Sequence, residues 1–467
     1  MSGGEVAAAP TAGPSSRPPT GTAAPAKPSS EVPGPRLPRL LQTLLGVARP
    51  VDSRLGMYHR YGGVFRTDDA IAGELFHVAE RGLVEQIFKW KPAQYSVGEP
   101  RQVMEPVVGP SSILLLDGEP HMRMRKLMLP PFHGEAIAQY AELIEEITNR
   151  EIDTWDPGDT IRTRSVAQRI TMEVIIRAIF GITDPGCIAM LRRVLPRLSS
   201  PNPLLLLVQK DLGPRSPWGR FVRLRDHVDR LLYEEIEQRR GDPHLDTRKD
   251  ILTLLLSARD EAGAPLTDRE LRDELITLLL AGHETTATTI AWAVERLLRT
   301  PSALERLIVE VEAGESEDYL DAVIKETLRV RPVVPEVFRA PTQPTELGGY
   351  EFAAGSQLAA SILLVQRDPE LYPPDPEAFR PERFLDGAPE PYTWVPFGGG
   401  VRRCLGAAFA TLEMKLVIST IFSRARLRAP RLKSEKARFR GVTLLPARGG
   451  EAIVEHSSLG APTVTRG

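Results

Sequence analysis

Cysteine and long hydrophobic runs are both scarce in this sequence of 467 residues. Only Cys187 and Cys404 are present, so at most one disulfide bond can form and no set of cysteines is available for an iron–sulfur cluster. No apolar stretch approaches the roughly 20 residues that a membrane-spanning helix needs. The formal net charge of −2 gives no argument for a nucleic-acid partner, and no repeat of fixed period is present. These absences favour a globular protein of the reducing cytosol without a membrane anchor.

The first 38 residues have an unusual composition. They contain nine prolines among many Ala, Ser, Gly and Thr residues. Such a segment cannot bury enough apolar surface to offset the entropy lost on ordering, and it lacks the hydrophobic run of a signal peptide. We therefore expect a disordered extension over residues 1–38. The polar end of the chain predicts a flexible tail over residues 456–467.

The segment between these ends has mostly helical patterning. Apolar residues recur at spacings of three and four in five segments, namely 135–152, 165–181, 218–239, 268–299 and 318–331. Strand-like segments are short and few, at 63–67, 74–79, 350–353 and 357–361. The pattern predicts a fold that is mainly α with a small β portion.

One segment places a cysteine in a glycine-rich loop. Phe397-Gly398-Gly399-Gly400-Val401-Arg402-Arg403-Cys404-Leu405-Gly406 precedes an apolar, helix-like run. Loop amides and a helix N-terminus stabilise a thiolate, glycines allow close approach of a cofactor, and an arginine can bind an anionic group on its edge. A lone cysteine is by default a buried free thiol, but the surrounding pattern favours a ligand to a large, flat, anionic cofactor.

This segment resembles the haem-binding loop of the cytochrome P450 family, whose fixed positions are filled by Phe397, Gly400, Arg402, Cys404 and Gly406. The resemblance implies that Cys404 is the axial thiolate ligand of the iron of haem b. It also implies the P450 fold, with the haem between a long central helix and the helix that follows the cysteine loop. Because motifs of one family span most of the chain, we expect a single domain over residues 39–455.

The longest predicted helix carries a second motif. It opens with the capping-box sequence Thr267-Asp268-Arg269-Glu270, and its middle reads Ala281-Gly282-His283-Glu284-Thr285-Thr286. A glycine, an acid and two threonines are locally unfavourable in a helix centre. They could be a satisfied polar patch at a helix crossing. The resemblance instead implies the oxygen-binding groove, with Glu284 and Thr285 delivering protons and with Ala281 and Thr285 on the face toward the haem.

The remaining family motifs supply structural and cofactor-binding residues. Glu326 and Arg329 share a helix face and resemble the family's Glu-x-x-Arg element, whose partner would be Arg383; the three are expected to form a buried structural cluster. The resemblance further implies that His121, Arg125, Arg339 and Arg402 bind the haem propionates and that Phe397 and Ala281 contact the cofactor. Each of these cations could alternatively lie on a solvated surface.

The substrate pocket is predicted from segments that form its walls in the family. The candidate residues are all aliphatic: Val107, Val108, Leu114, Leu278, Val333, Val334 and Val337. Residues 204–208, which are bracketed by prolines, could form an access lid or an ordinary ordered loop. An aliphatic pocket suits a lipophilic substrate such as a fatty acid, terpenoid, steroid or polyketide.

The sequence as a whole predicts a cytoplasmic monooxygenase that inserts one atom of O₂ into a lipophilic substrate by hydroxylation or epoxidation. Neither end of the chain is predicted to hold a flavin or iron–sulfur domain, so electrons from NAD(P)H would arrive through a ferredoxin or flavodoxin and its reductase. Arg123, Lys126 and Arg403 are candidates for a basic docking patch. The alternatives are a haem-thiolate isomerase, dehydratase or peroxygenase that needs no reductase, and a non-catalytic haem sensor or lipid carrier.

Overall fold

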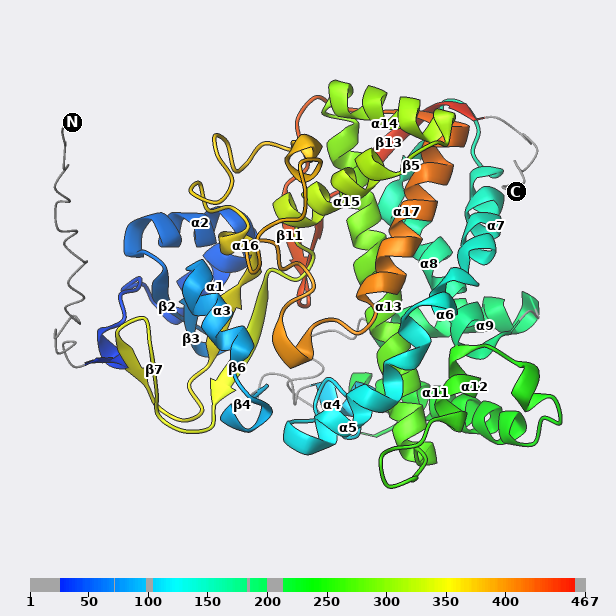
Figure 1. Ribbon diagram of the computed structural model, residues 1–467, viewed down its shortest axis with the longest axis horizontal. Helices are drawn as coiled ribbons and strands as arrows, with labels where there is room; N and C mark the ends of the chain where they lie inside the picture. The colour runs from blue at the N-terminus through cyan, green and yellow to red at the C-terminus, as the bar shows by residue number, and fades with distance from the viewer. Residues whose placement is uncertain (1–25, 71, 98–103, 183–184, 200–212, 458–467) are drawn as a thin grey trace, which may run out of the picture.

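A helix of 30 residues, α13 (Asp268–Leu297), runs through the middle of the molecule and contacts α8, α15 and α17 (Figure 1). It begins at the predicted capping box, in which Glu270 N donates to Thr267 Oγ1 at 3.2 Å and Thr267 N donates to Glu270 Oε2 at 2.8 Å. Most of its side chains are buried, because neighbouring helices surround it on several sides. The helix therefore forms the axis on which the central residues of the predicted site are placed.

The computed structural model describes residues 26–70, 72–97, 104–182, 185–199 and 213–457. The mainly α architecture with a small β portion is as predicted. The helices are α1 (Arg39–Ala48), α2 (Pro50–Tyr61), α3 (Arg81–Lys89), α4 (Glu105–Val108), α5 (Gly118–Met128), α6 (Glu135–Ala138), α7 (Ala141–Ile152), α8 (Thr163–Phe180), α9 (Pro185–Ser199), α11 (Pro217–Arg240), α12 (Ile251–Ser257), α13, α14 (Pro301–Ala313), α15 (Asp318–Val330), α16 (Ile362–Val365) and α17 (Ala407–Arg424).

Among the described residues the sheet portion consists of four sheets, and the largest lies beside the helices around α13. Its largest sheet has the strand order β2-β3-β9-β6-β4, in which β3 and β9 are parallel and the other pairs antiparallel. The strands are β1 (Lys27–Pro28), β2 (Val64–Asp69), β3 (Gly73–Val78), β4 (Tyr95–Ser96), β5 (Thr160–Arg162), β6 (Glu336–Pro341), β7 (Thr345–Leu347), β8 (Tyr350–Phe352), β9 (Leu358–Ser361), β10 (Ala425–Arg428), β11 (Ala437–Arg440), β12 (Thr443–Pro446) and β13 (Glu451–Ser457).

The N-terminal boundary of the folded part differs from the prediction. Residues 27–28 form β1, which pairs in parallel with β8, and Arg66 N donates to Pro33 O at 2.8 Å. Val32 is buried against the sheet core. The extension predicted over residues 1–38 therefore does not reach residue 38, because one valine in a proline-rich segment finds an apolar site that composition alone does not reveal. Residues 1–25 and the predicted lid at 204–208 lie outside the described residues.

The two largest hydrophobic cores among the described residues hold most of the molecule together. The larger core joins the helices around α13, and a smaller one joins the main sheet to α3. The predicted segment 135–152 is divided into α6 and α7, whereas the other predicted helices and strands agree with the structure to within a few residues. Among the described residues, no helix has both the length and the apolar character required to cross a membrane.

Candidate active site

The Cys404 loop connects the short helix η7 (Gly400–Arg402) to the start of α17. Cys404 N donates to Phe397 O at 2.9 Å, which closes the loop. Gly400 has a positive φ of 65°, and a Cβ on it would lie 2.0 Å from Phe88 O of α3. The glycines are therefore needed for close packing of the loop on α3, a requirement that the sequence alone did not show.

The Cys404 side chain is free and accessible, although it lies within the fold rather than on a projecting loop. Burial raises the pKa of the thiol, while the Gly406 amide and the Arg403 and Arg125 guanidinium groups act in the opposite direction. A Cβ placed on Gly406 would meet open space. The thiol therefore borders an opening and has nearby positive charge that favours its thiolate form.

Three arginines from distant parts of the chain converge near this opening. Arg125 lies on α5, Arg339 on β6 and Arg402 in η7. The guanidinium carbons of Arg339 and Arg402 lie 4.9 and 5.9 Å from the centre of the Tyr95 ring. Burial lowers the pKa of all three arginines, that of Arg339 to about 10, and repulsion from Arg402 lowers the pKa of Arg125 and Arg339 further.

This arginine cluster (Arg125, Arg339 and Arg402) has too few anionic partners. Arg402 Nη2 lies 2.7 Å from Asp117 Oδ1 and also donates to Leu116 O, while Arg339 Nη1 donates to Phe338 O at 2.8 Å. Within the described residues, Asp117 is the carboxylate paired with the cluster, and the Arg402 Nε is buried without a partner. Uncompensated buried charge is costly, so the cluster fits an anionic group such as the two propionates of a haem.

The other predicted cofactor contacts lie on the elements around the opening. His121 is buried on α5, four residues before Arg125. Phe397 packs edge-to-face on Trp394, with ring centres 6.2 Å apart. Ala281 is exposed although it lies in the middle of the otherwise buried α13. An exposed alanine there and an exposed cysteine in the loop before α17 are what a space for a flat cofactor between these helices requires.

The two predicted catalytic residues on α13 have different surroundings. The Thr285 hydroxyl is partly exposed and donates to Ala281 O at 2.7 Å, so its oxygen still has lone pairs that can accept a hydrogen bond. The Glu284 carboxylate is bound by two residues of α8: it pairs with the Arg164 guanidinium and accepts from Gln168 Nε2 at 2.6 Å. Glu284 is therefore directed toward α8.

The predicted structural cluster is assembled as expected. Glu326 and Arg329 are both fully buried, with Arg329 Nε 2.6 Å and Nη2 2.8 Å from the Glu326 carboxylate oxygens. Arg383 Nε lies 3.7 Å from Glu326. Arg329 also donates to three main-chain carbonyls, those of Gln366, Pro376 and Ala378.

The same region is linked to the cysteine loop. Gln366 Nε2 donates to Leu328 O at 3.0 Å, and its Oε1 accepts from Val395 N at 2.9 Å. Trp394 Nε1 donates to Lys325 O at 3.0 Å. Helix α15 therefore fixes residues 394–395, which lead directly into the loop at Phe397.

The predicted substrate-pocket residues divide into two groups by exposure. Four of them are partly exposed, so they can line a cavity: Leu114, Leu278, Val334 and Val337. The other three are buried among neighbouring side chains: Val107, Val108 and Val333. Val108 is completely inaccessible, because α4 packs against α13.

Helix α13 also holds the loop that follows α4. Ser111 N donates to Asp273 Oδ2 at 2.9 Å, Ile113 N donates to Glu274 Oε1 at 2.6 Å, and the Ser112 and Thr277 hydroxyls are 2.7 Å apart. Leu114 follows directly in this loop. Its position is therefore set by main-chain hydrogen bonds to two acidic side chains of α13.

The predicted docking cations are not free. Arg123 pairs with Asp260 and Glu270, each at 2.7 Å, and Lys126 pairs with Glu261 at 2.7 Å. These residues border a surface groove of 640 Å³ that contains both signs of charge. The prediction that Arg123 and Lys126 form a basic patch therefore needs correction, because the acidic segment before α13, which is remote in sequence, neutralises both. Arg403 is exposed.

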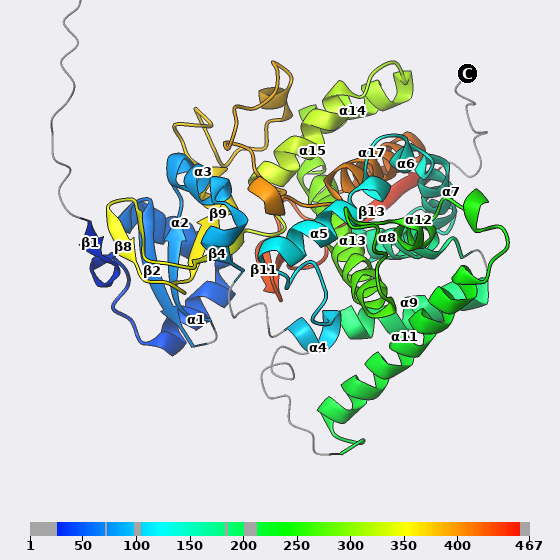
Figure 2. The same ribbon diagram turned by 60° about the horizontal axis from the view of Figure 1, so that its bottom comes forward.

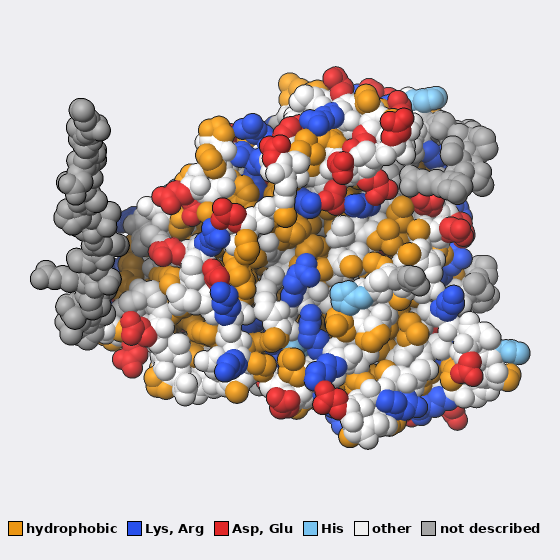
Figure 3. Space-filling view, in the orientation of Figure 1, with side chains coloured by type: hydrophobic (Ala, Val, Ile, Leu, Met, Phe, Trp, Pro, Cys, Tyr) orange, Lys and Arg blue, Asp and Glu red, His pale blue; other side chains and the backbone are white. Residues whose placement is uncertain are grey.

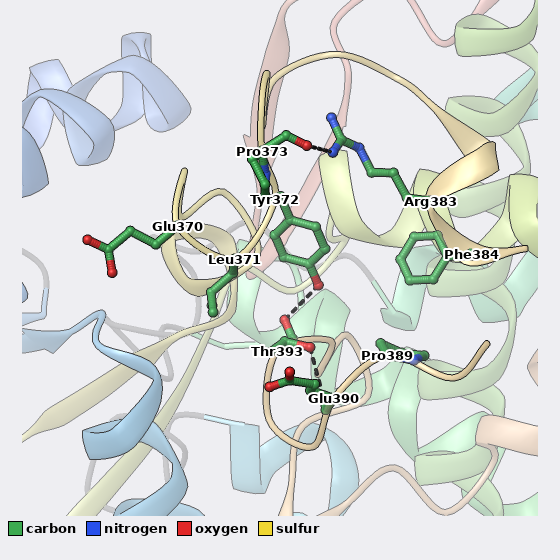
Figure 4. A pocket seen from close by; sticks show the side chains of 9 residues that line it. All are labelled: Glu370, Leu371, Tyr372, Pro373, Arg383, Phe384, Pro389, Glu390 and Thr393. Carbon is green, nitrogen blue, oxygen red and sulfur yellow. Dashed lines mark hydrogen bonds between the residues drawn. The ribbon is translucent and has the colours of Figure 1, made fainter. Parts of the chain in front are cut away.

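A second surface pocket, of 260 Å³, lies beside the structural cluster (Figure 4). Tyr372, Arg383 and Thr393 line it, and the Tyr372 hydroxyl donates to Thr393 O at 3.0 Å. Arg383 Nη1 donates to Pro373 O at 2.5 Å. These side chains are used in holding residues 372–393 together, so the pocket does not belong to the site around Cys404.

Sequence reasoning missed several residues that shape the site. Tyr95, Asp117, Arg164, Gln168 and Gln366 each contact a predicted residue but belong to none of the recognised motifs. Arg164 and Gln168 are spaced by four, which places them on one helix face. That spacing could have suggested a pair acting together, but nothing in the sequence connects it to Glu284.

Comparisons with known proteins find similarity over most of the chain. The family model for Cytochrome P450 matches residues 55–453. The chain is 40% identical over 429 residues to "Putative cytochrome P450 135B1" of Mycobacterium tuberculosis strain H37Rv, covering 90% of this chain and 91% of that protein. It is 37% identical over 441 residues to "Putative cytochrome P450 138" of Mycobacterium bovis, and the match covers 93% of this chain and 98% of that protein.

Solved structures are similar over nearly the whole chain. "Retinoic acid bound cyanobacterial CYP120A1" is 25% identical with a TM-score of 0.78 and covers 93% of this chain and 100% of that one. The "cytochrome P450DA heme domain" is 24% identical with a TM-score of 0.79. The match covers 93% of this chain and 99% of that one and shows that the two share a fold.

Proposed function

Because the chain belongs to the cytochrome P450 family, we propose that it inserts one oxygen atom from O₂ into a small lipophilic molecule, with electrons from a separate redox protein. It is an oxidoreductase, a P450 monooxygenase that uses haem b, as this family does. The observation that carries the proposal is the opening bordered by the Cys404 thiol and an under-compensated arginine cluster, together with the exposed stretch of α13 at Ala281 and Thr285.

The residues around the opening suit the family's cofactor. Cys404 would be the thiolate ligand of the iron, and His121 with the arginine cluster would bind the propionates. When bound, the haem supplies the iron at which O₂ is activated. The protein's contribution would be to fix the thiolate in a closed loop and to neutralise the carboxylates, so that the cofactor is held in one orientation.

Thr285 and Glu284 would manage protons beside the cofactor. The Thr285 hydroxyl gives its hydrogen to Ala281 O, so its oxygen can accept a hydrogen bond from a protonated group or water in the opening. Glu284 would carry protons when it separates from Arg164 and Gln168, because its carboxylate oxygens could then bind water in the opening. The pairing would thereby limit proton entry until α8 and α13 shift locally.

The substrate would be an apolar molecule. Leu114, Leu278, Val334 and Val337 offer aliphatic surface and no charged group. A structural neighbour binds retinoic acid, which supports a lipophilic substrate of the isoprenoid or fatty-acid kind. Hydroxylation of a C–H bond or epoxidation of a double bond would be the reaction.

Electrons would enter over the Cys404 loop. Figure 3 shows Lys and Arg side chains in a row down the middle of the face over this loop and α5. With Arg123 and Lys126 paired to acids, the exposed Arg403 is the remaining candidate of those predicted for contact with an acidic ferredoxin or flavodoxin. Reduction by such a protein should slow as ionic strength rises.

The test uses purified, haem-loaded protein and a library of lipids, terpenoids and steroids. A ligand that shifts the Soret band is then incubated with NADPH, a ferredoxin, its reductase and ¹⁸O₂. The expected result is one ¹⁸O atom in the product, with product formation that requires NADPH, the ferredoxin and the reductase. Product without the reductase, or without O₂, would instead identify an isomerase, dehydratase or peroxygenase and would refute the proposal.

A further inference from the structure

Helix α1 lies at the outer edge of the molecule (Figure 2), and three of its polar side chains bond to the neighbouring β2 and the turn after it. Arg39 Nε donates to Asp68 Oδ2 at 2.8 Å, and Asp68 N donates to Gln42 Oε1 at 3.0 Å. Ala70 N donates to Thr43 Oγ1 at 2.8 Å. The polar residues of α1 are therefore used to attach the helix to β2 and the turn that follows it. An amphipathic helix in a globular protein normally buries its apolar side instead.

The apolar side of α1 faces solvent. Leu40, Leu44 and Val47 follow one another at helical spacing and are 70%, 65% and 54% exposed. Leu37, Leu41 and Leu45 extend the surface, which we term the α1 leucine face. These six are the majority of the ten large hydrophobic residues that are exposed among the described residues. Contiguous apolar surface of this kind usually marks a binding site.

The charged residues that flank α1 in the sequence are arginines. Arg36 precedes the helix and Arg49 follows it, both are exposed, and neither has an ion-pair partner in the part of the chain that the structure describes. Helix α1 itself contains no acidic residue. Leucines flanked by arginines are typical of helices that lie in the interface of an anionic bilayer, where the apolar side enters the acyl region and the cations meet the headgroups.

Two other occupants fit the α1 leucine face less well. A second copy of the chain would bring Arg36 and Arg49 of the two copies together in a symmetric contact, which is repulsive. Residues 1–25 contain no leucine, isoleucine or aromatic residue and therefore offer little apolar surface to cover it. We propose that the α1 leucine face binds the surface of an anionic lipid bilayer. At ten residues, or about 15 Å, the helix would lie in the plane of the interface and would not cross it.

The experiment measures co-sedimentation of the full, haem-loaded protein with vesicles. One set contains phosphatidylcholine with phosphatidylglycerol, and the other contains phosphatidylcholine alone. The protein should bind the anionic vesicles more tightly, and added salt should weaken that binding. Leu40→Ser/Leu44→Ser should lower the partition coefficient roughly tenfold or more per leucine. Val309→Ser/Leu432→Ser, which alters two exposed apolar residues elsewhere, should leave it unchanged.

A second variant separates the charges from the apolar contact. Arg36→Glu/Arg49→Glu should weaken binding to anionic vesicles by about fivefold per arginine and should not weaken binding to neutral vesicles. The Soret spectrum and thermal midpoint should stay unchanged in all variants, because none of the altered side chains is buried.

Three results would overturn the proposal. The first is no binding of the unaltered protein to anionic vesicles. The second is equal binding by the α1 and the control variants. The third is a concentration-dependent dimer in sedimentation velocity that Leu40→Ser/Leu44→Ser abolishes without any effect on vesicles, which would assign the face to a second copy. None of these measurements depends on turnover, so they are independent of the proposed reaction.

Discussion

Replacing Arg329 with leucine should destabilise the protein severely, and the structure indicates by how much. Arg329 is fully buried and donates to both oxygens of Glu326 and to the carbonyls of Gln366, Pro376 and Ala378. Its removal leaves a buried carboxylate whose remaining partners are Arg380 N at 2.8 Å and Arg383 at 3.7 Å. Breaking a buried ion pair in this way costs about 3–5 kcal/mol.

The same loss of free energy predicts a decrease in the thermal midpoint. A folded region of roughly 400 residues has an unfolding entropy of about 0.8 kcal/mol/K, so the loss corresponds to a decrease of about 4–6 °C. The double variant Glu326→Leu/Arg329→Leu removes the unpaired charge but still leaves three carbonyls without their donor. It should therefore recover only part of the loss.

The assay is thermal unfolding followed by circular dichroism, together with the ratio of Soret to protein absorbance as a measure of haem retention. Because α15 also fixes residues 394–395, Arg329→Leu should lose haem as well as stability. Arg428→Leu is the control: Arg428 pairs with Glu455 at 3.2 Å on the surface, where such a pair contributes about 0–1 kcal/mol. An equal effect of the two substitutions, or full recovery in the double variant, would refute the reasoning.

Three further outcomes are expected. Cys404→Ser should abolish the strongly red-shifted Soret band of the reduced CO complex while Cys187→Ser keeps it, and the reverse result would reassign the ligand. Thr285→Ala should lower the amount of product formed per NADPH consumed. The control Thr289→Ala, which loses a similar hydrogen bond to a main-chain carbonyl, should not lower it. An equal yield per NADPH in the two variants would exclude the Thr285 hydroxyl from the reaction. Burial raises the pKa of Glu413 well above its ordinary value, so the protein should lose stability relative to Glu413→Gln as pH rises above about 4.3. Thermal midpoints between about pH 5 and about pH 8 should diverge, and a constant difference would contradict this pKa.

The fold could be predicted well because its long helices carry strong periodicity. The boundaries of α8, α11 and α13 follow directly from the spacing of apolar residues, and the capping box at Thr267 fixes where α13 begins. The predicted N-terminal boundary of the fold is wrong because a single tertiary contact orders a segment whose composition predicts disorder. Val32 orders a proline-rich segment by reaching the sheet core, and no periodic pattern signals that single contact.

Motifs in the sequence single out candidate site residues one by one, but they do not predict how these residues are arranged. Motifs identified Cys404, Glu284 and Arg329, since each has a recognisable local context. The partners of these residues come from remote segments, and their pairing depends on how helices cross. The sequence does not indicate Arg164 as the partner of Glu284, and it does not indicate the partners of Arg123, because Asp260 and Glu270 lie far from Arg123 in the sequence.

The charged side chains in the interior of this protein differ in how many hydrogen-bond and ion-pair partners they have. This difference indicates which of them can bind a ligand. Arg329 has a partner for every direction in which it can donate, so its charge serves packing and cannot bind a ligand. Among the described residues, the arginine cluster of Arg125, Arg339 and Arg402 is paired with one carboxylate, that of Asp117, which leaves positive charge that an anion would offset. Glu284 lies between these cases, because its partners Arg164 and Gln168 belong to another helix and can be exchanged for solvent if the helices separate slightly. We therefore propose a structural role for Arg329, anion binding for the arginine cluster and proton transfer for Glu284.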